Sequence, residues 1–320
     1  MNDLAKRANY AHDIATLQGL TGFVVKIGPN NFGVSAGPGS SGIPLAFFGD
    51  GSDGNAVIAV NTVLTRHMYY DNLTVNAGVT LTTNGYAVFV RGTATIDGTV
   101  EVGNTIDAVG GINGSFPPGV YGGAFWSSVP GQQPQGGSGQ IALVGATAAS
   151  ASGAGGSGGN SGAIGVTFGA GGTLTPDLNV PFRHPMGLLP FTLAPTNNTP
   201  GLSVYFNLTG GCSGGGGPGQ GGGQGGGGGT GGGVLLFYAA TIAISATGVL
   251  SARGGNGGDA ALAGDGGGGG GGGGGLIARM YNSLTNLGAF DVSGGAGGAG
   301  FGVGTAGAAG APGNVVQMTN

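Results

Sequence analysis

The chain has 320 residues, of which 83 are glycine, and its formal net charge is −4 with only 6% charged residues. The lysines Lys6 and Lys26 are too few to build the basic groove that binds nucleic acid, so the sequence excludes that class of partner. Disordered chains combine low hydrophobicity with high net charge, whereas 39% of these residues are hydrophobic, so we expect ordered glycine.

The first residues carry no apolar core of a secretory signal, and no apolar run reaches the roughly 18 residues of a membrane span. We therefore expect no membrane insertion, and assembly in the cytoplasm. The single cysteine, Cys212, excludes a disulfide framework and a cysteine-based metal cage.

Residues 3–18 have the pattern of an α-helix, which Asp3 can cap and Gly19 can end. A helix of this length is marginal alone in water, so we expect it to pack against a partner. The alternative is packing against its own chain. The residues expected to face the partner, as a docking surface within segment 1–20, are Leu4, Ala8, Ala11, Ile14 and Leu17.

Segment 21–48 follows as a predicted hairpin and linker. Residues 23–26 and 32–34 read as short strands around the polar turn at 28–31. The run from Leu20 to Phe32 resembles a hairpin common in tailed-phage fibres, although Ile27 stands where threonine is usual. The resemblance implies a position near the end of a trimeric fibre that attaches to the virion.

An internal repeat is the most informative feature. Three segments share the plan of a glycine, an apolar strand, a polar step, a glycine and two apolar residues: 85–103, 233–254 and 275–294. The corresponding apolar pairs are Val100/Val102, Leu250/Ala252 and Phe290/Val292, and residues 73–81 form a partial fourth copy. Units that cannot bury their own faces must stack, so we expect β-solenoid-like rungs in 49–103 and 233–320. Residues 48–103 also resemble a block found in phage structural proteins and glycine-rich surface proteins.

The long glycine runs, of which Gly266–Gly275 is the extreme, allow two interpretations. One is a flexible linker. The other is a set of extended polyproline-II-like helices, with three residues per turn and a rise of ~3.1 Å, which pack side by side and satisfy one another's amides. We favour the second, because the runs abut strongly apolar strands. The glycine-dense stretches 210–233, 254–275 and 294–313 resemble the fibre-tip adhesins of T-even-type phages, in which packed polyglycine helices form a platform and loops bind the receptor.

The insertion at 104–232 contains most of the irregularly placed aromatic residues. Aromatic residues and arginine are favoured anchors of interfaces, and loops on a rigid scaffold tend to carry recognition. The alternative is a small core within the insertion. The candidate receptor contacts are Trp126, Tyr121, Phe125 and Arg183.

No pattern predicts catalysis, a cofactor or a metal site. Asp97 and Glu101 flank a predicted strand, where a solvated edge explains them better than an acid–base pair. The histidines lack ligand spacing; they are His12, His67 and His184. The loop 50–55 (DGSDGN) has some features of a calcium loop but lacks the distal carboxylate.

The sequence predicts a mainly β protein with β-solenoid-like rungs, packed polyglycine helices and one short N-terminal α-helix. The expected function, with the resemblances, is that of a non-enzymatic phage virion protein, a homotrimeric tail-fibre or tail-tip component that contacts other virion proteins and a host receptor. The alternative is a capsid decoration or head-fibre protein, and a third hypothesis is a polysaccharide depolymerase on a β-helix.

Overall fold

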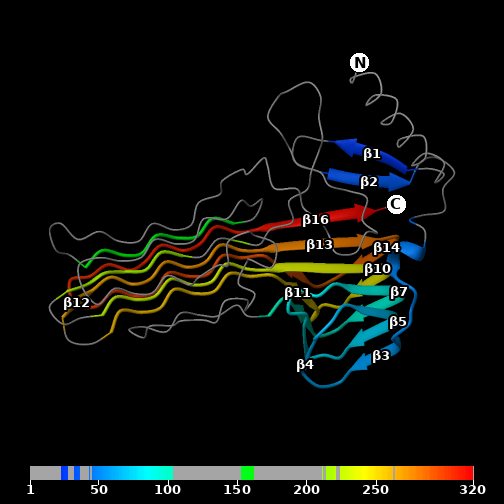
Figure 1. The fold of residues 1–320 in the computed structure, drawn as a ribbon, viewed down its shortest axis with the longest axis horizontal. Helices are drawn as coiled ribbons and strands as arrows, with labels where there is room; N and C mark the ends of the chain where they lie inside the picture. The colour runs from blue at the N-terminus through cyan, green and yellow to red at the C-terminus, as the bar shows by residue number, and fades with distance from the viewer. Residues whose placement is uncertain are drawn as a thin grey trace, which may run out of the picture.

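The computed structural model describes residues 23–27, 32–36, 43, 45–103, 153–161, 211, 214–220, 224–261 and 264–319. These residues form a mainly β protein whose two larger sheets consist of parallel strands (Figure 1). Within these ranges the one helical element is the short η1 (Leu45–Phe48), and no helix is long and apolar enough to cross a membrane. The mainly β class predicted from the sequence is confirmed.

The first sheet has the strand order β16-β13-β10-β7-β5-β3, and β14 also pairs with β10. The bounds are β3 (Gly54–Ile58), β5 (Met68–Val75), β7 (Val88–Ile96), β10 (Val234–Ile244), β13 (Leu276–Tyr281), β14 (Ser283–Asn286) and β16 (Asn314–Thr319). The second sheet has the order β15-β11-β8-β6-β4. Its strands are β4 (Thr62–Val63), β6 (Thr80–Thr82), β8 (Thr99–Glu101), β11 (Val249–Ser251) and β15 (Ala289–Asp291).

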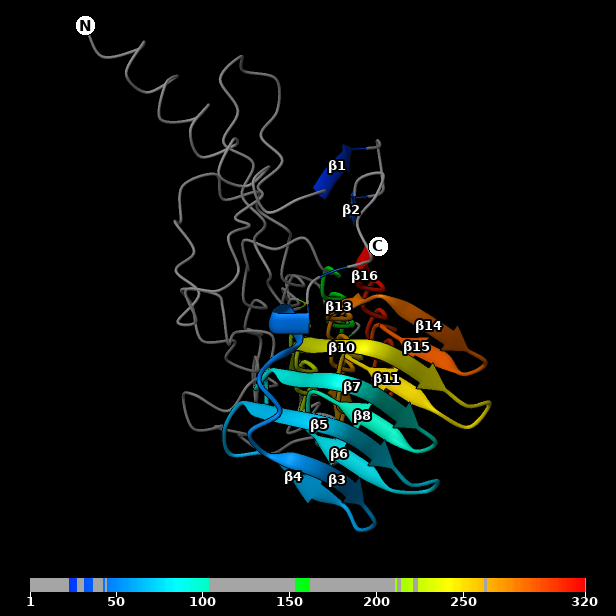
Figure 2. The same ribbon diagram turned by 90° about the vertical axis from the view of Figure 1, so that its right-hand side faces the viewer.

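Each repeat unit contributes to the first sheet and, after a turn, adds one strand to the second; the unit 275–294 gives the first sheet two strands, β13 and β14. We call such a unit a rung; Figure 2 shows the rungs in succession along both sheets. Val100 pairs with Leu250, and Leu250 pairs with Phe290, in parallel register. The residues that correspond in the sequence repeat are therefore paired in the structure.

The main hydrophobic core lies between the two sheets. Alternate residues of every rung point into it, as the two-residue period of a strand requires. Completely buried examples are Val90, Ile96, Phe237, Ile242 and Leu250. Each such side chain stabilises the fold by roughly 1.5–3 kcal/mol relative to exposure, so this core accounts for the packing of rungs that are far apart in sequence.

A second hydrophobic cluster covers the opposite face of the first sheet. Phe48 of η1 is completely buried against it, and Tyr69 stacks on Phe89 with ring centroids 5.0 Å apart. The segment that leads into η1 is fixed by Asn282, whose Oδ1 accepts from the Ile43 amide at 2.6 Å and whose Nδ2 donates to the Ile43 carbonyl at 2.9 Å. This pair of bonds ties the N-terminal part of the chain to the body.

The strands β1 (Phe23–Ile27) and β2 (Phe32–Ala36) form an antiparallel hairpin, with Ile27 opposite Phe32. The two strands predicted for segment 21–48 are therefore confirmed. In Figure 1 the hairpin lies beside β16. The helix predicted at 3–18 lies outside the described residues.

Candidate functional site: the glycine array

Seven glycine-rich segments lie side by side and extend from one end of the sheets (Figure 1). We call them together the glycine array. The segments are 153–161, 211–220 with 212 and 213 not described, 224–233, 252–261, 264–275, 292–301 and 304–313. Segment 264–275, called the central segment, contains the ten consecutive glycines.

The backbone N–H groups of the central segment donate in turn to three different neighbouring segments. Gly268, Gly271 and Gly274 donate to segment 304–313, at 2.8–2.9 Å. Gly269, Gly272 and Gly275 donate to segment 252–261, at 2.7–2.9 Å. Gly267 and Gly270 donate to segment 211–220, at 2.8 and 2.7 Å. Every third residue thus donates in the same direction.

The carbonyls of the central segment follow the same period toward three further neighbours. Those of Gly267, Gly270 and Gly273 accept from segment 224–233, at 2.8–2.9 Å. Those of Gly268, Gly271 and Gly274 accept from segment 153–161, at 2.7–2.9 Å. Those of Gly266, Gly269 and Gly272 accept from segment 292–301, at 2.8 Å. The central segment is therefore hydrogen-bonded to all six other segments of the array.

Close approach of the backbones explains why residues 267–275 of the central segment are all glycine. A Cβ atom on Gly268, Gly269 or Gly270 would overlap a backbone carbonyl oxygen of segment 292–301, 224–233 or 153–161, respectively. The obstacle is in each case backbone, which cannot swing aside as a side chain can. Since three successive residues face three different neighbours, no position from Gly267 to Gly275 has room for a side chain.

In two of the outer segments, 292–301 and 304–313, many side chains face solvent. In segment 304–313 glycine occurs at every third position, and Ala308 and Ala309 between them are exposed. In segment 292–301 the exposed positions are Ser293, Ala296 and Ala299, each three residues apart, and Phe301 at the turn. In these two segments the exposed side chains thus recur with the three-residue period of the array.

Short polar side chains cap amides at the surface of the array. Asn256 Oδ1 accepts from the Ala296 amide at 2.8 Å, and Asp259 Oδ1 accepts from the Ala299 amide at 2.6 Å. These acceptors take the place of a further neighbouring segment. They satisfy donors that would otherwise lose a partner.

The end of the array farthest from the sheets carries a turn at 301–304. The Gly304 amide donates to the Phe301 carbonyl at 3.0 Å, Gly302 has a φ of +66°, and the Asp265 carboxylate accepts from the Val303 amide at 3.0 Å. Phe301 and Val303 are nevertheless 47% and 67% exposed. The turn thus presents two apolar side chains from a fixed backbone. Nearby, β9 (Gly219–Gln220) pairs with β12 (Asp265–Gly266).

Comparison with known proteins gave no relative. No family model, curated protein or solved structure matches this chain.

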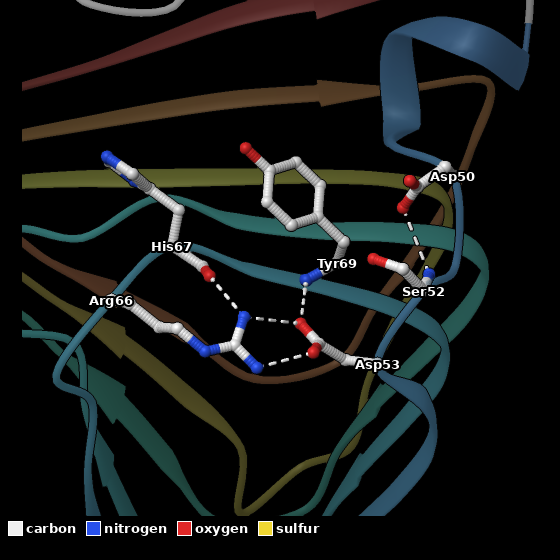
Figure 3. Close-up of polar contacts among 6 residues, drawn as sticks. All are labelled: Asp50, Ser52, Asp53, Arg66, His67 and Tyr69. Atoms are coloured by element: carbon white, nitrogen blue, oxygen red, sulfur yellow. Dashed lines mark hydrogen bonds and ion pairs between the residues drawn. The ribbon is translucent and has the colours of Figure 1, made fainter.

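A polar cluster at the start of β3 is the strongest ionic feature of the described residues (Figure 3). The Asp53 carboxylate accepts from Arg66 at 2.5 and 3.1 Å and from the Tyr69 amide at 2.7 Å. Arg66 also donates to the His67 carbonyl at 3.1 Å. The contacts of Asp53 join the loop before β3 to the residues at the start of β5, so the cluster fixes the first two rungs to each other.

Ionisation of this cluster follows from its contacts. The hydrogen bond from Arg66 is the largest of the causes that hold the pKa of Asp53 below its ordinary value. The pKa of Asp50 is also lowered, chiefly by the Ser52 amide, which donates to Asp50 Oδ1 at 3.0 Å. Within the described ranges no group of three or more His, Cys, Asp or Glu side chains is placed to hold a metal ion. Asp53 is engaged by protein donors, which argues against the calcium-loop alternative.

The structure places the other singled-out residues as follows. His67 Nδ1 accepts from the Ala87 amide at 2.9 Å, and Glu101 Oε1 accepts from the Thr82 hydroxyl at 3.1 Å. The predicted docking and receptor residues all lie outside the described residues: Leu4, Ala8, Ala11, Ile14, Leu17, Tyr121, Phe125, Trp126 and Arg183. Sequence reasoning missed the turn at Phe301 and Val303, which the interruption of the glycine triplets there could have indicated.

Arg279 is a buried cation that the sequence gave no reason to single out. Its guanidinium lies 4.0 Å from the ring centroid of Phe290, and its Nη2 donates to Gln317 Oε1 at 2.6 Å. Its Nε and Nη1 are buried without an acceptor. Burial is the main reason that the pKa of Arg279 is lowered. The side chain covers the last aromatic residue of the core at the β15 edge.

Proposed function

We propose that this chain is a non-enzymatic structural protein of a phage virion, a tail-fibre or tail-tip protein whose glycine array is a rigid platform for receptor contact. In this proposal the rungs form a β-solenoid and the array segments are polyproline-II-like helices. The three-residue period of the donors supports the helices, because such a helix has three residues per turn. The parallel, in-register rungs support the solenoid.

The observation that carries the proposal is the bonding of the central segment to six neighbours. Glycine loses more conformational freedom on folding than any other residue. The entropy cost of ordering so many glycines must therefore be offset by many hydrogen bonds, each of which contributes about 1 kcal/mol. The result is a stiff body with few side chains, which suits a scaffold better than chemistry. Localisation to the virion and the lack of catalysis follow from this proposal.

The exposed turn at the far end of the array is the part best placed to meet a receptor. Phe301 and Val303 project from a backbone that is already ordered, so binding would cost little conformational entropy. Apolar and aromatic anchors of this kind dominate many interfaces. The loops of 104–232 remain predicted contacts as well, and multiple copies in one particle would add avidity.

Location can be tested with antibodies raised against the purified chain. Particles from cells that carry the gene are labelled and viewed by electron microscopy. Label at the tail tip supports the proposal. Label spread over the capsid supports instead the alternative of a decoration or head-fibre protein, for which a stiff glycine body would serve equally. Absence of label from intact and disrupted particles would exclude a virion protein.

Receptor contact needs a separate test. Particles whose protein carries Phe301→Ser and Val303→Ser should adsorb to host cells several-fold more slowly, since the turn keeps its backbone bonds but loses its apolar anchors. Ala309→Ser, elsewhere on the array surface, is the matched control. Equal adsorption by both variants would exclude this turn as a receptor contact.

A further inference from the structure

The edge formed by β3 and β4 carries an unusual set of side chains. Among the described residues both strands are the last of their sheets, so neither has a strand partner on its outer side there. Val57 and Val63, one on each strand, are 66% and 58% exposed, and Val60 in the turn between them is 71% exposed. Edge strands of natural proteins are normally protected by charges, prolines or a cover.

The other rungs show that these valines are not required by the fold. Val57 pairs with Thr74, which pairs with Thr95. Val63 pairs with Thr82, which pairs with Glu101. At the same two outward-facing positions, the next two rungs therefore have polar side chains. The edge rung is more apolar than its neighbours at the place where it is most open to water.

The charge of this edge favours a copy of itself as the occupant. Residues 54–65 contain no charged side chain. The flanking Asp53 and Arg66 form an ion pair with each other, at 2.5 Å. A partner with a strongly charged surface would find no complement here, whereas two uncharged, apolar edges can meet without repulsion.

Register excludes the simplest alternative, which is stacking of this edge on the β14–β15 end of another copy. The Asp53 amide donates to the Tyr69 carbonyl, so residue 53 lies at the level of Tyr69. Tyr69 is connected to Met318 by successive residue pairs across the first sheet, through Phe89, Tyr238 and Met280, so all of them lie at the same height along the strands. A copy added at the far end would therefore place residue 53 where β16 already lies. Two copies that meet at their β3–β4 edges have no such conflict.

We infer that the β3–β4 edge is a pairing surface for a second copy of this chain. The two copies are related by a two-fold axis, so that β3 runs antiparallel to β3 of the second copy and β4 to its β4. This arrangement is isologous, the commonest form of soluble homo-oligomer. It joins both sheets across the interface, covers the three valines, and directs the two glycine arrays away from each other. The inference does not rest on the proposed function.

The test is the mass of the full-length chain in solution, measured by sedimentation equilibrium over a range of concentrations. The double variant Val57→Thr/Val63→Thr gives the edge the threonines of the next rung, which that rung tolerates in the same backbone. We expect the wild type to be a pair, and the dissociation constant of the pair to rise at least about tenfold in the double variant. Val303→Thr is the control, because Val303 is equally exposed but lies in the turn at 301–304.

The outcomes separate clearly. A pair that the double variant weakens and the control does not supports the inference. It is overturned if the wild type sediments as single chains at about 100 μM, where a pair with a micromolar dissociation constant is nearly complete. It is equally overturned by a trimer, or by a folded double variant, verified by circular dichroism, that associates as tightly as the wild type.

Discussion

A single methyl group in the middle of the glycine array tests the central physical argument. In Gly270→Ala, the new Cβ would overlap the carbonyl oxygen of Gly156, so segment 153–161 must move away. Three bonds join that segment to the central one, from Gly153, Gly156 and Gly159, at 2.7–2.9 Å. At about 1 kcal/mol for each bond, we expect the free energy of unfolding to fall by about 3 kcal/mol.

Urea denaturation measures this loss, and amide hydrogen exchange shows whether it is confined to the array. Ala309→Ser is the matched control: it also adds one heavy atom, but at an exposed position of segment 304–313, and should change the free energy of unfolding by less than about 0.5 kcal/mol. If Gly270→Ala unfolds at the same urea concentration as this control, the array does not depend on close contact between its backbones.

Three further substitutions test contacts in the body. Tyr238→Phe removes a hydroxyl that is buried without a partner, so we expect stability to rise by up to about 1–3 kcal/mol in thermal unfolding; a loss would show that the hydroxyl is bonded. Asn282→Ala removes both bonds to Ile43, which should speed proteolysis near residue 43 while the sheets stay protected; unchanged cleavage would contradict the clamp. Asp53→Asn should lower the melting temperature at pH 7. A carboxylate whose pKa is lowered by folding stabilises the folded state at every pH above its pKa in the unfolded chain, which is about 3.9. As pH falls through the lowered pKa, the wild type loses this stabilisation. A difference in melting temperature between wild type and variant that persisted in strong acid would refute the role of the Asp53 charge.

Repetition is what made the rungs predictable. The spacing of Val100, Leu250 and Phe290 from their flanking glycines gave the register of the second sheet, because equivalent positions of stacked units must meet. The hairpin at 23–36 was likewise visible, since its strands flank a polar turn.

Contacts between unlike segments could not be predicted in this way. Asn282 reaches Ile43 across 239 residues, and neither residue belongs to a pattern that names the other. Segment 153–161 shares no apolar motif with the central segment, yet three of its amides donate to it. Side-chain stacking such as that of Arg279 on Phe290 depends on three-dimensional packing that no local sequence rule encodes.

The triplet order of the array also restricts how such a protein can change during evolution. In the central segment, every third residue forms hydrogen bonds with the same neighbour. Inserting a single residue would therefore rotate every later amide by about 120°, so that it would point toward a different neighbour. Adding or removing three residues keeps all directions and only lengthens or shortens the block. Length variation among descendants of this gene should therefore occur in multiples of three within the array, while the turns at its far end can vary by any number.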